Sequence, residues 1–244
     1  MIAALGITLL GILAGWVVNL LADTMPDRRS LRQTWHWPLQ RFGLLSPQPV
    51  YGGTDWSATV STTLPTGRRY LLVWLVAICL GWFAYLQVGL RPQAFLVAAE
   101  AWFFLTIAVI DLEHRLVLNR MLLAASPAVL GANLLIGHAT ITSALLGAAA
   151  GFGLFLLIAL LAPGGMGMGD VKLAGLIGLT TGLSSVLSAL FIAILIGGIA
   201  GAVVLFKSRF RRGQTMAYAP YLVVGVWVVL FDGIGLLHSY LEHL

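Results

Sequence analysis

The sequence is dominated by apolar runs of the length that a helix needs to cross a lipid bilayer. Hydrophobic residues make up 59% of the 244 residues and charged residues only 9%, against roughly 25% charged residues in an ordinary soluble domain. A bilayer core takes about 20 apolar residues per helix. The chain is therefore predicted to be an all-α, polytopic transmembrane helical bundle of about eight membrane segments, at 2–22, 70–90, 94–112, 120–137, 141–162, 171–182, 184–206 and 217–238.

The positions of arginine and lysine predict which side of the membrane each loop faces. Of the 14 basic residues, only Arg91 falls in an even-numbered loop. Because short loops rich in Lys and Arg stay in the cytosol, the odd-numbered loops are predicted to be cytosolic and both termini to lie outside. If 171–182 did not cross or re-enter the membrane, the basic residues after 206 would face outward. The basic residues of the odd-numbered loops are Arg28, Arg29, Arg32, Arg41, Arg68, Arg69, Arg115, Arg120, Lys172, Lys207, Arg209, Arg211 and Arg212.

The whole chain, 1–244, is expected to form a single membrane-embedded domain. The N-terminal run lacks the basic flank and small-residue end of a signal peptide, so we expect a retained anchor. The first loop, about 26–69, contains five of the nine prolines and shows no helical or strand period. It is predicted to be an irregular cytosolic excursion.

Composition also excludes several functions and supports close helix packing. No basic stripe with interleaved aromatic residues is present, which argues against nucleic-acid binding, whereas membrane lipids are expected partners. Cys79 is the single cysteine, so the chain can form neither an internal disulfide nor a thiolate zinc site. Glycine pairs at Gly147/Gly151 and Gly178/Gly182 permit close helix contact.

Two aspartates lie at the ends of membrane-length segments and form the candidate catalytic pair. Asp111 ends one apolar segment, and Asp170 closes the glycine-rich run 164–170. Two neighbouring carboxyls titrate as a unit, so one can take a proton from an attacking water while the other donates to the developing oxyanion. Glycines such as Gly167 and Gly169 let a substrate backbone approach closely. The alternative is that both are interfacial charges, with Asp170 an N-cap or first-turn residue.

The surroundings of both aspartates resemble a known family. Gly-x-Gly-Asp followed by Val171-Lys172-Leu173, with an earlier Ile-Asp-Leu-Glu segment, resembles the type IV prepilin peptidases, membrane aspartyl proteases that mature pilins and pseudopilins. Asn19 followed by Pro26 is similar to the family's amino-terminal segment. The sequence from Ala219-Pro220 to Gly225 is similar to its late Gly-Pro-Phe-Leu-x-x-Gly element.

The resemblance implies an aspartic-type endopeptidase with Asp111 and Asp170 as catalytic residues. Its expected substrates are prepilins or pseudopilins, cut at the cytosolic face of the inner (plasma) membrane. Gly167, Gly169, Lys172, Asn19 and Pro220 are then expected to line the substrate or to support the site.

The sequence departs from the family pattern at three places. Leu118-Asn119 stands where a proline is usual, although Asn119 can cap the next helix, and Thr24 stands where the family has arginine. Large bifunctional members carry two Cys-x-x-Cys pairs in the first cytosolic loop and also N-methylate the new amino terminus. Since 26–69 contains no cysteine, no metal is expected, and S-adenosylmethionine is a cofactor only if methyltransferase activity is retained.

Other polar residues and other functions give alternatives. Glu100 lies about 16 Å before Asp111 along a helix, too far to join the pair, which suggests an internal polar contact or a water-lined cavity. His114 could face Asp111, although a solvated interfacial histidine is the expectation, and Lys172 is expected to reach the headgroups. A presenilin-like intramembrane protease is the near alternative. A proton-coupled transporter could also keep two buried carboxyls, although it should show inverted repeats and a midplane site.

Overall fold

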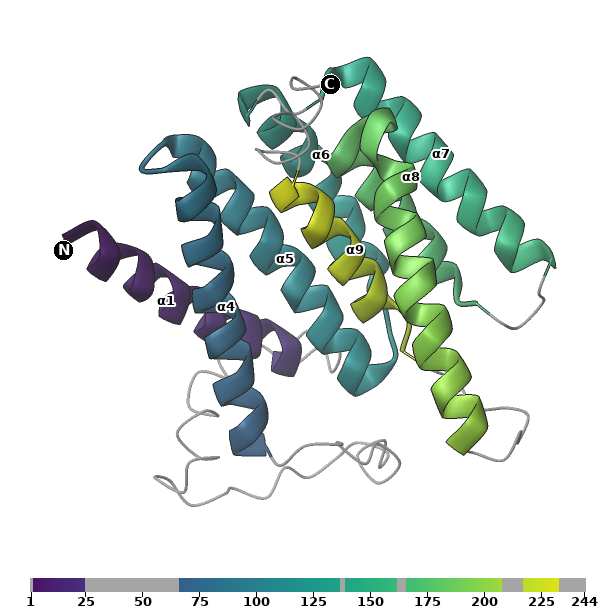
Figure 1. Ribbon diagram of the computed structural model, residues 1–244, viewed down its shortest axis with the longest axis horizontal. Coiled ribbons are helices and arrows are strands. Elements are labelled where there is room, and N and C mark those ends of the chain that lie inside the picture. The colour runs from purple at the N-terminus through teal and green to yellow at the C-terminus, as the bar shows by residue number, and fades with distance from the viewer. Residues whose placement is uncertain (1, 25–65, 137–138, 162–165, 208–216, 233–244) are drawn as a thin grey trace, which may run out of the picture. The chain divides into compact units, whose positions relative to one another are not determined.

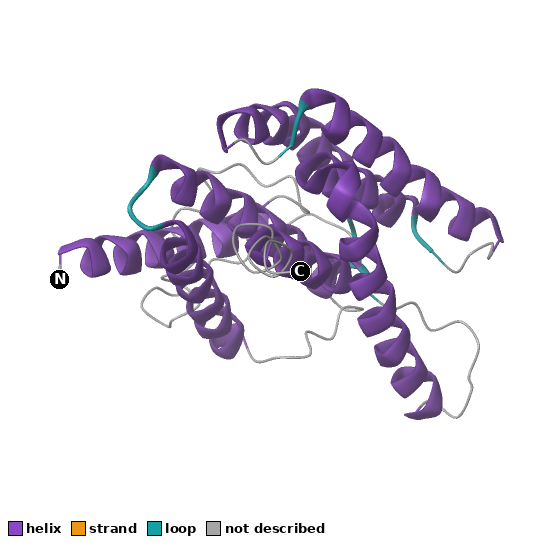
Figure 2. Ribbon diagram, turned by 45° about the horizontal axis from the view of Figure 1, so that its top comes forward, coloured by secondary structure: helices purple, strands orange, loops and turns teal. Residues whose placement is uncertain are grey.

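The described part of the chain is helical throughout its regular structure. The computed structural model describes residues 2–24, 66–136, 139–161, 166–207 and 217–232, and Figure 2 shows only helices and loops in these ranges. The all-α prediction is therefore confirmed. The helices, labelled in Figure 1, are α1 (Ile2–Thr24), α4 (Thr66–Val88), α5 (Pro92–His114), α6 (Asn119–Ile136), α7 (Ile141–Leu161), α8 (Met168–Lys207) and α9 (Ala219–Asp232).

Several of these helices are long and apolar enough to cross a membrane, which confirms a multi-pass membrane protein. Among the described residues there are five such spans, and α9 provides a shorter apolar helix, Ala219–Phe231. The expected total of eight crossings stays a prediction. Most of the predicted 26–69 loop and the end of the 217–238 segment lie outside the described residues. The spans are Ala3–Thr24, Arg68–Val88, Pro92–His114, Ile141–Leu161 and Met168–Val203.

Helix α8 is broken at Gly182, between the two segments predicted at 171–182 and 184–206. Gly182 has φ 72° and ψ 176°, a conformation open mainly to glycine. A Cβ added to Gly151 of α7 would contact both the carbonyl oxygen of Ala174 and Cγ2 of Val186, which would lie about 18 Å apart along a straight helix. The chain therefore turns back at Gly182, and 168–181 and 183–207 form two arms.

Side chains from two neighbouring helices satisfy the backbone groups that the break releases. In an unbroken helix the Leu183 N–H would donate to the Leu179 carbonyl. Here the Leu183 N–H donates to Ser143 Oγ at 3.0 Å, and the Leu179 carbonyl accepts from Asn133 Nδ2 at 2.7 Å. Because an unsatisfied backbone group in lipid costs several kcal/mol, Asn133 on α6 and Ser143 on α7 stabilise the reversal.

Glycines bring α7 and the first arm of α8 into backbone contact. A Cβ on Gly147 would meet the carbonyl oxygen of Gly178, and a Cβ on Gly178 would meet that of Gly147. Gly151 is equally close to the Ala174 carbonyl. The close helix contact expected from the Gly147/Gly151 and Gly178/Gly182 pairs is confirmed, and Figure 1 shows α7 beside α8.

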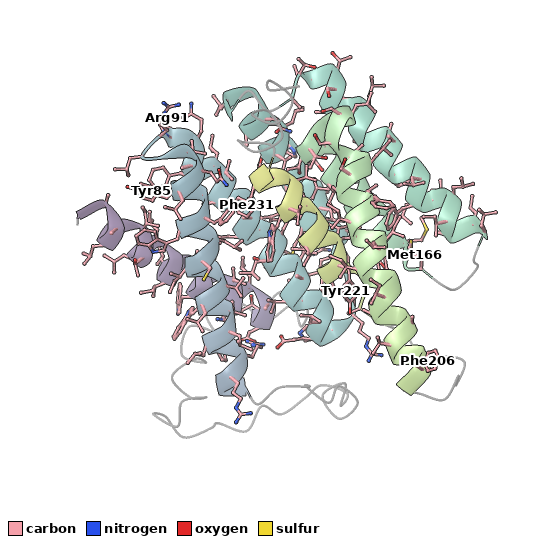
Figure 3. All side chains as sticks on the ribbon, in the orientation of Figure 1. Tyr85, Arg91, Met166, Phe206, Tyr221 and Phe231 are labelled. Carbon is pink, nitrogen blue, oxygen red and sulfur yellow. The ribbon has the colours of Figure 1, made fainter. Side chains whose placement is uncertain are left out.

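By its internal contacts the chain divides into two compact units, residues 1–82 and 83–244. In the first unit, α1 packs against α4 where Gly11 approaches Ile78 and Gly15 approaches Trp74. The second unit contains α5 to α9, with Tyr221 and Phe231 marking the two ends of α9 in Figure 3. The expectation that both units act as one domain stays a prediction.

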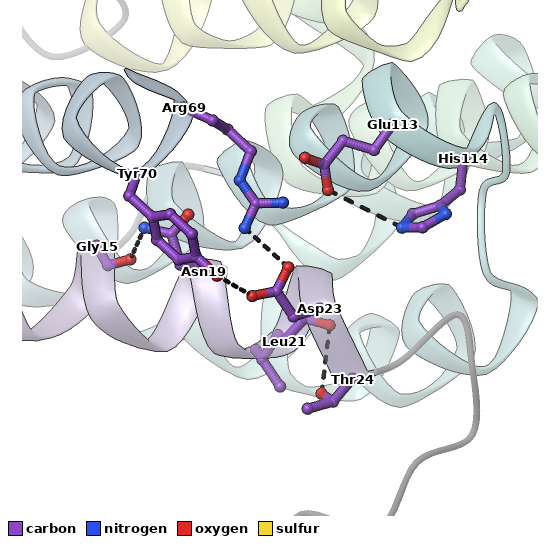
Figure 4. A network of polar contacts seen from close by, with 9 residues as sticks. All are labelled: Gly15, Asn19, Leu21, Asp23, Thr24, Arg69, Tyr70, Glu113 and His114. Carbon is purple, nitrogen blue, oxygen red and sulfur yellow. Dashed lines mark hydrogen bonds and ion pairs between the residues drawn. The ribbon is translucent and has the colours of Figure 1, made fainter. Parts of the chain in front are cut away.

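A buried polar cluster in the first unit joins the end of α1 to the start of α4. Asp23, 7% exposed, accepts a hydrogen bond from Arg69 Nη2 at 2.8 Å and another from the Tyr70 hydroxyl. The Arg69 guanidinium also lies 4.4 Å from the Tyr70 ring centroid. Figure 4 shows Asp23 between these two partners. The cluster ties together the two helix ends that flank the predicted first loop.

Candidate active site

Asp111 lies in the last turn of α5, where the helix is brought to a defined end. Arg115 takes the left-handed conformation, φ 51° and ψ 44°, and its N–H donates to the Asp111 carbonyl at 2.8 Å. The guanidinium of Arg115 also interacts electrostatically with the Asp111 carboxyl. The side chain of Asp111 is almost fully buried at 4% exposure. A carboxyl this buried needs polar partners.

The start of α9 supplies one such partner. The backbone N–H of Ala219, the first residue of α9, donates to Oδ2 of Asp111 at 3.0 Å. First-turn N–H groups have no partner within their own helix, so this donor is available to a side chain. Pro220 follows in the first turn, where the missing N–H costs no helical bond. The segment from Ala219 to Gly225, which resembles the family's late element, thus provides a backbone hydrogen bond to Asp111.

Asp170 lies in the first turn of α8 and is partly buried. The backbone amide of Gly167 hydrogen-bonds its carboxyl, and the Asp170 N–H donates to the Gly167 carbonyl at 3.0 Å. A Cβ on Gly167 would lie 3.3 Å from Oδ2 of Asp170, which would crowd the carboxyl. Each candidate carboxyl therefore accepts a hydrogen bond from a backbone amide.

Gly169 allows the first turn of α8 to approach the loop between α5 and α6. A Cβ at this position would lie 2.8 Å from Cβ of Val117, closer than two carbon atoms can pack. Glycine here is required by contact within the protein itself. The glycine run thus positions Asp170 beside the end of α5.

The structure brings the two aspartates together. Asp111 and Asp170 are close enough for their carboxyls to interact electrostatically, although they come from different helices. Groups coupled in this way do not ionise independently. The arrangement can activate a water molecule between two carboxyls, and the catalytic role itself is taken up as a proposal below.

Tyr218 is a neighbour of Asp170 that the sequence analysis missed. It interacts electrostatically with Asp170, and its ring lies 6.2 Å from that of Phe155 and 6.1 Å from that of Tyr221, centroid to centroid. Gly197 makes room for this ring, since a Cβ there would lie 2.8 Å from Cε2 of Tyr218. Its position directly before Ala219-Pro220 was the available signal.

The other polar residues singled out in the sequence make contacts of their own. Lys172 donates from Nζ to Oδ1 of Asn119 at 2.9 Å, so Asn119 uses its side-chain oxygen for Lys172. Asn19 belongs to the first unit, where its Nδ2 donates to the Gly15 carbonyl at 2.9 Å, a contact drawn in Figure 4. Glu100 is 6% exposed, and neither carboxyl oxygen has a hydrogen-bond partner in the described part of the chain. The imidazole of His114 lies 3.9 Å from the Glu113 carboxyl.

The described residues contain no group of three or more His, Cys, Asp or Glu side chains that could hold a metal ion.

Comparisons with known proteins agree with this site. The model of the type IV leader peptidase family matches residues 98–202, which include both aspartates. No solved structure matches the chain.

Curated relatives match a larger part of the sequence. A prepilin leader peptidase/N-methyltransferase of Bacillus subtilis is 30% identical over 69% of this chain and 68% of its own length. Proteins of the same name from Xanthomonas campestris and Pseudomonas aeruginosa are 30% and 29% identical, with 64% and 62% of their lengths covered. The chain thus spans about two thirds of the length of these relatives. With the paired carboxyls and the multi-pass helical fold, these matches show that the chain belongs to the type IV leader peptidase family.

Proposed function

We propose that this protein is a membrane aspartyl endopeptidase that removes the leader peptide from prepilin-like substrates, with Asp111 and Asp170 as its catalytic pair. The observation that supports this most directly is that Asp111, 4% exposed, lies near enough to Asp170 for the two carboxyls to interact electrostatically. Both are fixed by backbone amides, from Ala219 and Gly167. Fixed donors of this kind hold a reactive group in place without side-chain rearrangement.

In the proposed reaction the two aspartates share one proton between them. The anionic carboxyl takes a proton from a water molecule as the water oxygen attacks the scissile carbonyl carbon. The protonated carboxyl donates its proton to the developing oxyanion. When the tetrahedral intermediate collapses, the C–N bond breaks, the carboxyl that took the water proton gives it to the leaving amine, and the other carboxyl takes back the proton that it had given to the oxyanion. The pair then returns to its starting state with one proton.

The substrate class follows from the relatives. They are named prepilin leader peptidases, so the substrates proposed here are prepilins or pseudopilins. We place the protein in the inner membrane with the carboxyl pair toward the cytosol, because Arg115, Arg120 and Lys172 all flank this end of the helices and basic loops stay cytosolic.

The methyltransferase activity in the relatives' names is not part of this proposal. The zinc-binding cysteine pairs that the resemblance implies for the first loop have no counterpart here, since residues 26–69 contain no cysteine. His36 is the one histidine in this loop and cannot supply a four-ligand site. Processed substrate is therefore expected to keep an unmethylated amino terminus, and mass spectrometry of the product would reveal any methyl group that depends on this protein and S-adenosylmethionine.

The proposal is tested by replacing each aspartate. Asp111→Asn and Asp170→Asn keep the size of the side chain and remove the acid-base pair, so each should abolish leader cleavage, by about 10⁴-fold or more, and the double variant should lose no more. Glu113→Gln, a neighbouring carboxyl change at the same helix end, serves as the matched control and should keep most of the activity.

The same variants decide between the alternatives. A folded, membrane-inserted Asp170→Asn protein that still cleaves a prepilin would overturn the carboxyl pair as the catalytic residues, whereas a folded wild-type protein that cleaves no prepilin would favour a transporter. Cleavage within the membrane-embedded part of a substrate, instead of at its leader junction, would favour the presenilin-like alternative.

A further inference from the structure

A cavity of about 540 Å³ lies between α6, α7 and α8, and its one charged lining residue, Lys172, stands at one end. Lys172 and Asn119 form this polar end, and Ser126, whose hydroxyl donates to the Leu122 carbonyl at 2.8 Å, is a further polar residue of the lining. The rest of the lining is mainly apolar and includes Leu122, Phe152, Leu176 and Leu179. Because Leu179 lies about 10 Å beyond Lys172 along the helix axis, the cavity extends from the start of α8 toward the middle of the bundle.

The polar end carries a positive charge that no carboxylate of the lining balances. Lys172 Nζ donates to the neutral amide oxygen of Asn119 at 2.9 Å, which uses one of its three donors. Ion pairs within the described part of the chain, such as Arg69–Asp23 and His114–Glu113, do not include Lys172. The lining itself contains neither aspartate nor glutamate. The cavity therefore favours an anion at this end.

The apolar part is open toward the surroundings of the helices. Leu123, which also lines the cavity, is 78% exposed, and in a membrane-spanning bundle such leucines face lipid chains. Small residues keep the apolar part free, since Ala148 and Gly175 stand on the facing helices α7 and α8. A long apolar chain can thus enter from the side while a charged head stays near Lys172.

We propose that this cavity binds one anionic phospholipid. The phosphate lies beside the Lys172 ammonium and the Asn119 amide, and one acyl chain lies along Leu122, Phe152, Leu176 and Leu179. A zwitterionic lipid would bring a quaternary ammonium group to an end of the cavity that has no acidic partner, so the site should select against phosphatidylcholine. Since Lys172 is two residues from Asp170 in sequence, the headgroup lies on the same membrane side as the carboxyl pair.

The test is native mass spectrometry of the detergent-solubilised full chain with phosphatidylglycerol and phosphatidylcholine of identical acyl chains. The wild type should retain phosphatidylglycerol in preference. Lys172→Met should lower the ratio of the two lipids about fivefold, the effect of one basic residue near a membrane surface, and Lys172→Arg should keep it. Lipid retention does not depend on cleavage, so this test is separate from that of the proposed function.

A second pair of variants addresses the apolar part. Ala148→Leu fills the cavity and should reduce retention of both lipids, whereas Ala149→Leu adds the same side chain at an exposed neighbouring position and should not. If Lys172→Met does not fold, these two leucine variants still test whether a lipid binds in the cavity. An unchanged lipid ratio in Lys172→Met, equal retention by the two leucine variants, or displacement of phosphatidylglycerol by a synthetic leader peptide would each overturn the proposal.

Discussion

The backbone N–H of Ala219 donates to Oδ2 of Asp111 at 3.0 Å, across 108 residues of sequence. This contact couples the beginning of α9 to the end of α5. Gly167 makes the corresponding amide contact to Asp170. Because both donors belong to the backbone, replacement of side chains around the site would leave them in place and would not reveal them.

Ala219→Pro removes this donor and adds two ring carbons at a fully buried position. Proline is tolerated at the first position of a helix, so α9 should still form. The Asp111 carboxyl, however, loses the hydrogen bond that the residue 219 N–H donates to it. Such bonds contribute about 1.5–3 kcal/mol, and kcat for leader cleavage should fall roughly 10- to 100-fold. Ala219→Val keeps the N–H and adds a side chain of similar size at this buried position, so it is the matched control. Equal activity of the two variants would mean that the Ala219 donor does not support the reaction.

Gly169→Ala should displace Asp170, because the new Cβ would lie 2.8 Å from Cβ of Val117. A misplacement of about 1 Å can cost 10²-fold in rate, so cleavage should fall by roughly that factor. Adding Val117→Gly removes the clashing atom and should restore most of the activity, whereas Val117→Ala keeps the Cβ and should not. Rates measured for the two double variants check this. Equal rescue by both would show that the contact with Val117 Cβ is not the cause.

Gly182→Ala should destabilise the protein by a few kcal/mol. Its φ of 72° is unfavourable for a residue with a side chain, and the added Cβ would lie 2.9 Å from Ser143 Oγ. Gly153→Ala on α7 is the control, since nothing lies within 4 Å of a Cβ there and alanine favours a helix by about 1 kcal/mol. Thermal unfolding in detergent should rank Gly153→Ala above the wild type and Gly182→Ala below it. The reverse order would contradict the reversal described for α8.

The proposed orientation predicts which end of α5 faces the cytosol. Leu90 and Leu116 flank α5 and are 64% and 50% exposed. In a Cys79→Ser background, Leu90→Cys should react with a membrane-impermeant maleimide in intact cells, and Leu116→Cys only after permeabilisation. Labelling of Leu116→Cys in intact cells would place the carboxyl pair outside and contradict the orientation inferred from the basic residues.

The helical segments could be predicted from the sequence because their signal is local. Runs of about 20 apolar residues identify helices, and apolar runs also gave the division into 171–182 and 184–206, with charge placement as support for the first of these crossing or re-entering the membrane. In the described residues this division occurs at Gly182. The pairing of Asp111 with Asp170 was also predicted, since a carboxyl within an apolar chain needs a polar partner.

Contacts between distant segments could not be predicted in the same way. Asn133 and Ser143 have no local feature that marks them as partners of Leu179 and Leu183, because the need arises only when α8 turns back. The Ala219 donor is a backbone group, which amino-acid type does not reveal. Glu100 was expected to make a polar contact or to face a water-lined cavity, and the described residues provide no hydrogen-bond partner for its carboxyl oxygens, so the water-lined cavity stays a prediction.

The reversal at Gly182 has a consequence for the order in which the chain is made. The two side chains that satisfy its backbone groups, Asn133 and Ser143, are synthesised before Gly182 leaves the ribosome. A nascent chain therefore meets the turn at Gly182 when the helices that accommodate it already exist. A circular permutant that begins between α7 and α8 would have to insert the same turn first, with its polar groups facing lipid.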